Sequence, residues 1–70
     1  MSMTEKIKIV MVKRGMSGVD LAARLKITPS TLYIKFKKDK YSVHDLEKIA
    51  NALDCKFEGN LVLNDTGEKV

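Results

Sequence analysis

The pair Thr28-Pro29 constrains the fold most, because it starts a helix only three residues after an earlier helical segment ends. A threonine hydroxyl caps a helix well, and proline loses no hydrogen bond at the first helical position. The earlier segment begins at Ser17-Gly-Val-Asp20, a capping-box pattern with aspartate in place of glutamate, and runs to about Leu25. Two short helices joined by so short a turn meet at a steep angle. The sequence therefore predicts a helix-turn-helix over residues 17–38.

Two further segments carry helix signals. Ser2-Met-Thr-Glu5 is a capping box that opens a helix to about Arg14, where Gly15 ends it. Ser42-Val-His-Asp45 caps a fourth helix that runs to about Leu53. Apolar residues recur at helical spacing and predict the inward faces: Ile7, Val10, Met11, Leu21, Ala22, Leu25, Leu46, Ile49, Ala50 and Leu53.

The tail reads differently. Phe57 to Leu63 alternates weakly, Asn64-Asp-Thr-Gly67 has strong turn chemistry, and Glu68 to Val70 fits the start of a returning strand. We expect an extended arm or a short β-hairpin. The predicted fold is all-α: a four-to-five-helix bundle with a helix-turn-helix domain over residues 1–54, and an arm over residues 55–70 as a candidate dimerisation element.

Seventy residues make one domain with a marginal core, which disulfides, a metal or tight helix packing and oligomerisation usually support. Cys55 is the only cysteine, and with His44 it is too little for a zinc site. We therefore expect helix packing and a homodimer, with no metal and no cofactor. The longest apolar run, Ile9 to Val12, is far below the roughly 18 residues that span a bilayer. A soluble, cytoplasmic protein without a membrane partner is expected.

The charge is uneven. Residues 24–40 hold six basic residues and one acidic residue, a net charge of +5, whereas the whole chain carries +4 and residues 41–70 carry −3. Such a basic segment is typical of a surface that binds a polyanion. An ordinary solvated lysine face fits the charge alone equally well.

The third helix presents a polar and basic face. At about 100° per residue, Leu32 and Phe36 point inward, and the opposite side carries Ser30, Ile34 and Lys37. Thr31, Tyr33 and Lys38 flank this strip. In a DNA major groove the Ile34 side chain would meet a thymine methyl group, although a scattered surface apolar residue is also ordinary. Ser30 and Thr31 can hydrogen-bond base edges or a phosphate, and Lys37 can reach a guanine or the DNA backbone. The Tyr33 hydroxyl can reach a phosphate; alternatively, its ring lies over the edge of the core.

Phosphate contacts are predicted at the helix N-termini. The starts of the second and fourth helices, at Ser17-Gly18 and Ser42, present free amides and a partial positive charge. Plain capping explains these serines too. The predicted phosphate-binding set is completed by Thr28, Lys35, Lys38, Lys40 and Tyr41. Such contacts set affinity and orientation but carry no sequence information.

The stretch from Met16 to Phe36 resembles the helix-turn-helix of Cro and lambda-type repressors. The resemblance covers about residues 5–54 and is carried by Leu21-Ala22, Leu25, Ile27, Ser30-Thr31-Leu32, Leu46, Ile49-Ala50 and Leu53. It implies a compact helical bundle that regulates transcription, such as one from a phage or mobile element, usually as a dimer on a palindromic operator in double-stranded DNA. It also implies base contacts at Pro29, Ser30 and Ile34.

Two residues depart from the family pattern. Pro29 stands where a long polar side chain is usual, and it cannot hydrogen-bond a base. Lys26 stands where the family has a turn glycine, so we expect backbone strain or a different turn there.

Some residues also fit functions other than DNA binding. Ile9, Val12 and Val19 are apolar where the family is polar, which fits self-association or a module redirected to protein binding, such as an antirepressor. The run of Lys35, Lys37, Lys38 and Lys40 favours DNA. An enzyme is disfavoured because no nucleophile, base and orienting group stand out as a set, so no catalytic residue is predicted. No effector domain is evident, so no small-molecule effector is expected.

Overall fold

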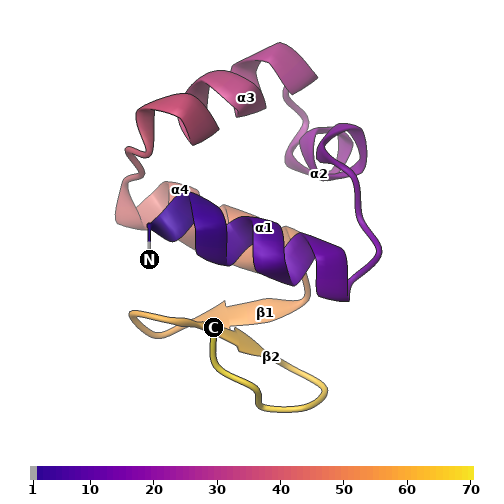
Figure 1. Ribbon diagram of the computed structural model, residues 1–70, viewed down its shortest axis with the longest axis vertical. Coiled ribbons are helices and arrows are strands. Elements are labelled where there is room, and N and C mark those ends of the chain that lie inside the picture. Colours follow the sequence, from indigo (N-terminus) through magenta and orange to yellow (C-terminus); the bar gives the residue numbers. More distant parts are fainter. Residues whose placement is uncertain (1) are drawn as a thin grey trace.

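The computed structural model describes residues 2–70 as four helices followed by a short antiparallel hairpin (Figure 1). The elements are α1 (Met3–Lys13), α2 (Gly18–Leu25), α3 (Pro29–Lys38), α4 (Val43–Ala52), β1 (Cys55–Phe57) and β2 (Leu61–Leu63). In Figure 1, α3 lies at one end of the long axis and the hairpin at the other, with α1 and α4 across the middle. The predicted helical bundle with a helix-turn-helix and a C-terminal hairpin is confirmed. Within residues 2–70, no helix is long and apolar enough to cross a membrane.

Each helix starts at its predicted cap. Ser2 accepts a hydrogen bond from the amide of Glu5, and Ser17 and Ser42 both form complete capping boxes with the aspartate three residues later. Thr28 Oγ1 accepts the amide of Thr31 at 3.2 Å. These local bonds fix where each helix begins, and the Thr28 cap thereby sets where the turn after α2 ends.

Three helices are followed by a non-glycine residue in the left-handed conformation. Lys26, Asp39 and Asp54 have φ angles of 59°, 51° and 54°. This region is usually filled by glycine, because a Cβ atom crowds the backbone there. The strain expected at Lys26 is therefore present, and its amide still bonds the carbonyls of Ala22 and Ala23. Gly15 has φ 63° and ends α1 as predicted.

The core joins all four helices to the hairpin. The largest fully buried side chains are Ile7, Val10, Leu21, Leu32, Leu53 and Leu61. The predicted inward faces of α1 and α4 are buried, and in α2 Leu21 and Ala22 are buried while Leu25 is half-buried. Leu21 and Leu32 come from the two helices of the helix-turn-helix, so the same core that stabilises the domain also sets the orientation of α3.

The tail forms the short β-hairpin, one of the two expected alternatives. The alternating stretch from Phe57 to Leu63 contains a turn, in which the Glu58 amide donates to the Asn60 carbonyl at 2.9 Å and Gly59 has φ 76°. This turn reverses the chain within the stretch and joins β1 to β2. The later turn at residues 64–67 is present, and Lys69 forms a bridge with Val62.

The hairpin shares the core of the helices. Strand register pairs Cys55 with Leu63 and Phe57 with Leu61, and Cys55, Leu61 and Leu63 are buried in the common core. The expected boundary between residues 54 and 55, and the dimerisation role of the tail, stay predictions.

Arg14 connects the end of α1 to the tail. Its guanidinium donates to the carbonyls of Leu53 and Asp54 at 3.0 and 2.9 Å. It also forms a bidentate pair with Asp65, at 2.9 Å for each bond. A planar guanidinium suits this fork geometry, which ammonium groups cannot reproduce. Arg14 therefore joins segments that are 39 to 51 residues apart in the chain.

Thr4 fastens the other end of α1 to the end of α3. Its amide and hydroxyl donate to Asp39 Oδ1 at 2.9 and 2.7 Å, and its Oγ1 lies 2.6 Å from the Tyr41 hydroxyl. Thr4 is the one buried polar residue in the described chain, and no side-chain polar atom buried there lacks a hydrogen bond. The network holds the C-terminal end of α3 against α1.

Acid should destabilise the fold in a predictable direction. Four carboxyl groups have a pKa below the ordinary value of 3.8 because each accepts hydrogen bonds: Asp20 from Ser17, Asp39 from Thr4, Asp45 from Ser42 and Asp65 from Arg14. In the unfolded chain these bonds are lost and each pKa returns toward 3.8. The carboxylates therefore contribute stability above this value, and the contribution is lost as the pH falls below about 4.

Urea unfolding followed by circular dichroism at a series of pH values measures this loss. Asp65→Asn should reduce the fall in the free energy of unfolding, because one of the four carboxyl groups no longer titrates. Stability that rises on acidification through the same range would contradict the assignment.

Candidate nucleic-acid interface

The outward side of α3 carries the predicted reading strip. Leu32 and Phe36 are buried, whereas Ser30, Ile34 and Lys37 are exposed. The rotation predicted from the sequence therefore agrees with the observed exposure. Ile34 leaves 54% of its surface exposed, so a large apolar side chain stands among polar neighbours. The contact of this strip with bases stays a prediction.

The first turn of α3 is tied together by its own side chains. The hydroxyls of Thr28 and Thr31 lie 2.8 Å apart, and Thr28 also caps the helix. Pro29 is half-buried at the first helical position. Ser30 is exposed, but unlike Thr28 and Thr31 its side chain makes no hydrogen bond within residues 2–70.

The serines at the starts of α2 and α4 act as caps. Ser17 Oγ lies 2.9 Å from Asp20 Oδ2, and the Ser42 amide donates to Asp45 Oδ2 at 3.0 Å. The first amides of a helix have no partner inside the helix. A cap satisfies only some of them, so an anion at these ends would bind the backbone amides of Gly18 and Val43 rather than the serine side chains.

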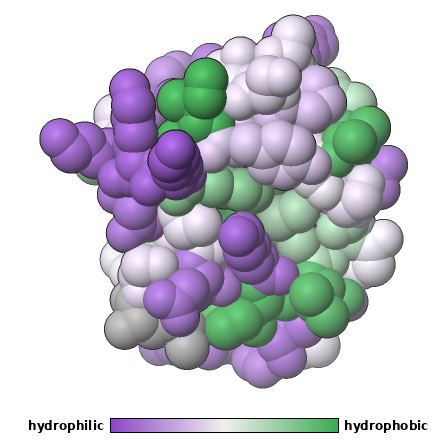
Figure 2. Space-filling view, turned by 45° about the horizontal axis from the view of Figure 1, so that its top comes forward, coloured by the Kyte–Doolittle hydropathy of each residue, from purple (hydrophilic) through white to green (hydrophobic). Residues whose placement is uncertain are grey.

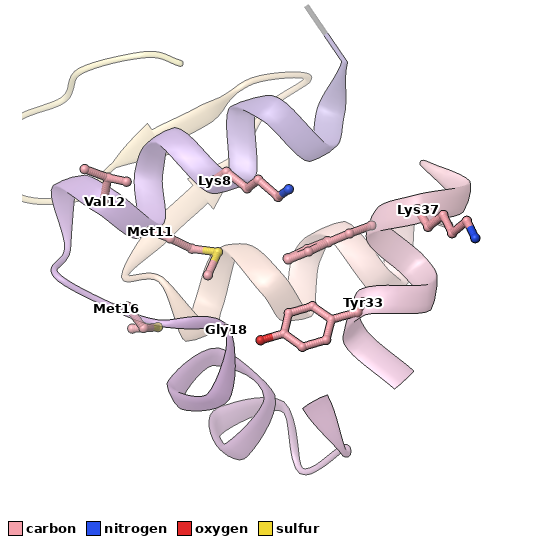
Figure 3. Close-up of a pocket in the computed structure, with 8 residues that line it drawn as sticks. Lys8, Met11, Val12, Met16, Gly18, Tyr33 and Lys37 are labelled. Atoms are coloured by element: carbon pink, nitrogen blue, oxygen red, sulfur yellow. The ribbon is translucent and has the colours of Figure 1, made fainter. Parts of the chain in front are cut away.

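The Tyr33 ring lies against the start of α2. A Cβ atom on Gly18 would stand 2.8 Å from the Tyr33 hydroxyl oxygen, so only glycine permits this approach without moving the ring. In Figure 3 the hydroxyl points toward Gly18. Tyr33 remains 51% exposed, and its ring centroid is 6.4 Å from that of Phe36. The ring thus packs on its neighbours, as one of the two sequence-based alternatives expected, while contact of the hydroxyl with a phosphate stays a prediction.

The basic residues near α3 divide into two groups. Lys37, Lys38 and Lys40 are exposed and form no ion pair within residues 2–70. Lys35 instead lies 3.4 Å from Asp45 of α4 and contributes to the lowered pKa of that carboxyl group.

Tyr41 also faces the protein. Its hydroxyl is held by Thr4, and burial raises its pKa. Two members of the predicted phosphate-binding set, Lys35 and Tyr41, therefore make contacts within the molecule.

An apolar groove adjoins this surface and was not predicted. It has a volume of about 530 Å³ and is lined by Lys8, Met11, Val12, Met16, Gly18, Tyr33, Phe36 and Lys37. Figure 2 shows pale green apolar surface in a hollow of the molecule, with purple hydrophilic side chains around it. The sequence marked Val12 as an unusual apolar residue and gave Gly18, Tyr33 and Lys37 roles in DNA contact, but it did not predict that these residues line one groove. The spacing of Lys8, Met11 and Val12, at i, i+3 and i+4, is the signal that marks them as one helical strip.

Cys55 and the acidic residues show no sign of a metal site. Within residues 2–70, no group of three or more His, Cys, Asp or Glu side chains is placed to hold a metal ion. The Cys55 thiol is buried, lies 3.4 Å from the Leu53 carbonyl and has a pKa raised by burial. A small buried side chain with a protonated thiol is typical of a core position.

A family model described as the Cro/C1-type HTH DNA-binding domain matches residues 6–64. The match includes α2, α3, α4 and both strands. No curated protein and no solved structure matches the chain.

Proposed function

Because the chain belongs to the Cro/C1-type helix-turn-helix DNA-binding family, we propose that it is a sequence-specific transcriptional regulator whose α3 reads the major groove. The observation that carries this proposal is the exposed strip of Ser30, Ile34 and Lys37, on the side of α3 opposite its buried residues. A single α-helix with outward polar and apolar side chains fits the width of the major groove. The proposal assigns the protein no catalytic role.

The residues of α3 take different parts in reading. Lys37 reaches a guanine, Ser30 bonds a base edge, and Ile34 packs on a thymine methyl. Thr31 and Tyr33 flank these contacts, and Pro29 adds apolar contact only. Specificity therefore rests on the middle of the helix rather than on its first residue.

Phosphates are held around this strip. The amides at Ser17-Gly18 and at the start of α4 after Ser42 bind two backbone positions, with Lys38 and Lys40 adding charge. Thr28 lies at the edge of this set. We assign Lys35 and Tyr41 to packing instead, since Asp45 and Thr4 already engage them.

The proposal extends to a homodimer that acts in the cytoplasm on a palindromic operator. A two-fold dimer would present two copies of α3 to successive major grooves, about 34 Å apart. Sedimentation with and without duplex DNA measures the oligomeric state, and the symmetry of selected sites provides an independent test.

Binding to random duplex DNA across a salt series, followed by selection of the bound sequences, tests the function. Phosphate contacts release counterions, so affinity should fall steeply as salt rises. Binding that is absent, or indifferent to salt, would contradict DNA recognition by this surface.

Ser30→Ala and Ile34→Ala test the reading strip on the selected sequence. Each should relax preference at particular base pairs by about 1–3 kcal/mol, because one base contact is lost while the phosphate contacts remain. Repeating the selection with each variant measures this change. Lys38→Ala is the control, which should weaken binding to all sequences about equally; the same profile from all three variants would refute the division of roles.

A further inference from the structure

The groove between α1 and the helix-turn-helix has two chemically different ends. Val12 and Met16 form one end, whereas Lys8 of α1 and Lys37 of α3 lie at the other (Figure 3). Lys8 and Val12 are one helical turn apart, about 6 Å along the axis. Met11 supplies the floor between them, with its sulfur directed into the groove. A ligand that matches this surface is apolar at one end and anionic at the other.

The basic end has no acidic partner. Lys8 and Lys37 form no ion pair within residues 2–70, and Lys8 Nζ lies 5.6 Å from the centroid of the Phe36 ring. A cation over an aromatic face at this distance is held in place but keeps its donors available. This end is therefore complementary to carboxylates.

The apolar end is left uncovered by the proposed DNA contact. Val12 is 80% exposed and adjoins Met16. DNA bound through the Gly18 amide and the Lys37 side chain would engage these polar groups but offers little to methionine and valine side chains. Methionine adapts to partners of varied shape, and such lining is typical of surfaces that receive peptide side chains. Because Val12 is so exposed, a partner can bury this end only if it is extended and covers the surface around Val12.

We propose that this groove docks an acidic, apolar peptide segment of a partner protein, with its apolar side chains over Val12 and Met16 and its carboxylates at Lys8 and Lys37. The regulatory consequence rests on the proposed function: Gly18 and Lys37 belong to both surfaces, so the bound peptide excludes DNA. The partner would release the regulator from its operator by occupying the shared residues.

The test uses the full chain, labelled with nitrogen-15, and a short synthetic peptide with Leu and Phe in one half and Asp and Glu in the other. A nitroxide label on the apolar half should broaden the amide signals of Val12 and Met16 more than those of Lys37. A peptide with Lys in place of its acids should not bind. The proposal would be overturned if the acidic peptide did not bind, or if decanoate bound at the groove and the peptide did not. It would also be overturned if the label broadened amide signals elsewhere in the protein instead.

Two variants outside the DNA-reading surface test the two ends. Lys8→Gln should weaken peptide binding about two- to fivefold, as expected for an exposed ion pair. Val12→Ser should weaken it about fivefold, through loss of apolar burial. Lys48→Gln, at an exposed position on α4, is the matched control for charge and should leave peptide binding unchanged. Equal effects of Lys8→Gln and Lys48→Gln would overturn the assignment of the basic end.

Separate titrations keep the two proposals distinguishable. Duplex DNA alone tests DNA recognition, and peptide alone tests docking. With both present, the peptide should displace DNA, and a stable complex of all three components would overturn the exclusion. If only the DNA titration fails, the proposed function is overturned, and so is the exclusion of DNA by the peptide. The peptide titration still tests the docking site in that case.

Discussion

A chain with Leu32 replaced by alanine is expected to lose about 2–5 kcal/mol of its free energy of unfolding. Leu32 is fully buried between the helices of the core, so the shorter side chain leaves a cavity that the packed surroundings cannot fill. A domain of this length has a total stability of about 4–10 kcal/mol, so the loss is a large part of the whole. Urea unfolding monitored by circular dichroism measures it.

Ile34→Ala is the matched control for this prediction. It shortens an apolar side chain on the same helix, but at an exposed position, and should change stability by no more than about 0.5 kcal/mol. Equal losses from the two variants would show that burial does not distinguish the two faces of α3. The two variants should also affect DNA binding in different ways. Leu32→Ala reduces the fraction of folded protein, whereas Ile34→Ala alters the base preference of a protein that stays folded.

Replacement of Lys38 and Lys40 together by glutamine is expected to have the second large effect. If each lysine neutralises one phosphate, the slope of log affinity against log salt should become shallower by about 1.8, which amounts to roughly 60-fold weaker binding near 0.1 M salt. Fluorescence anisotropy with a labelled duplex across a salt series measures both quantities. Because the contacts are to phosphate, all sequences should be affected alike.

The hairpin offers a control with the same loss of charge. Lys56 and Lys69 lie in the tail, at the opposite end of the molecule from α3 in Figure 1. Glutamine at both positions should leave the salt slope within about 0.3 of the parent, since counterion release requires contact with phosphate. Equal loss of affinity in the two double variants would mean that net charge, rather than a defined surface, governs binding.

The helices and the orientation of α3 could be predicted because their signals are local. A serine or threonine cap and the residue that it bonds lie three positions apart, so Ser17 and Thr28 reveal where α2 and α3 begin. The inward position of Leu32 follows from helical geometry once the helix is known. The charge of the segment around α3 is likewise a property of the sequence alone.

Long-range contacts could not be predicted in the same way. Thr4 and Asp39 are 35 residues apart, and nothing in the sequence near either one identifies the other. Arg14 reads as the end of a helix, although its guanidinium organises the tail. The pairing of Lys35 with Asp45 was not visible in the sequence for the same reason. The groove was missed because its residues come from three separate segments.

The strained backbone at the end of α2 has a consequence for how this domain can diversify. Asp39 and Asp54 share the left-handed conformation with Lys26, but their side chains accept hydrogen bonds from Thr4 and Asn64. Lys26 makes no such bond within residues 2–70, and a left-handed conformation costs a non-glycine residue about 1–2 kcal/mol. Relief of this strain at residue 26 would therefore stabilise the domain without changing the reading strip. A substitution that weakens α3 while changing what it recognises can be offset there, so binding preference can diverge while the fold is kept.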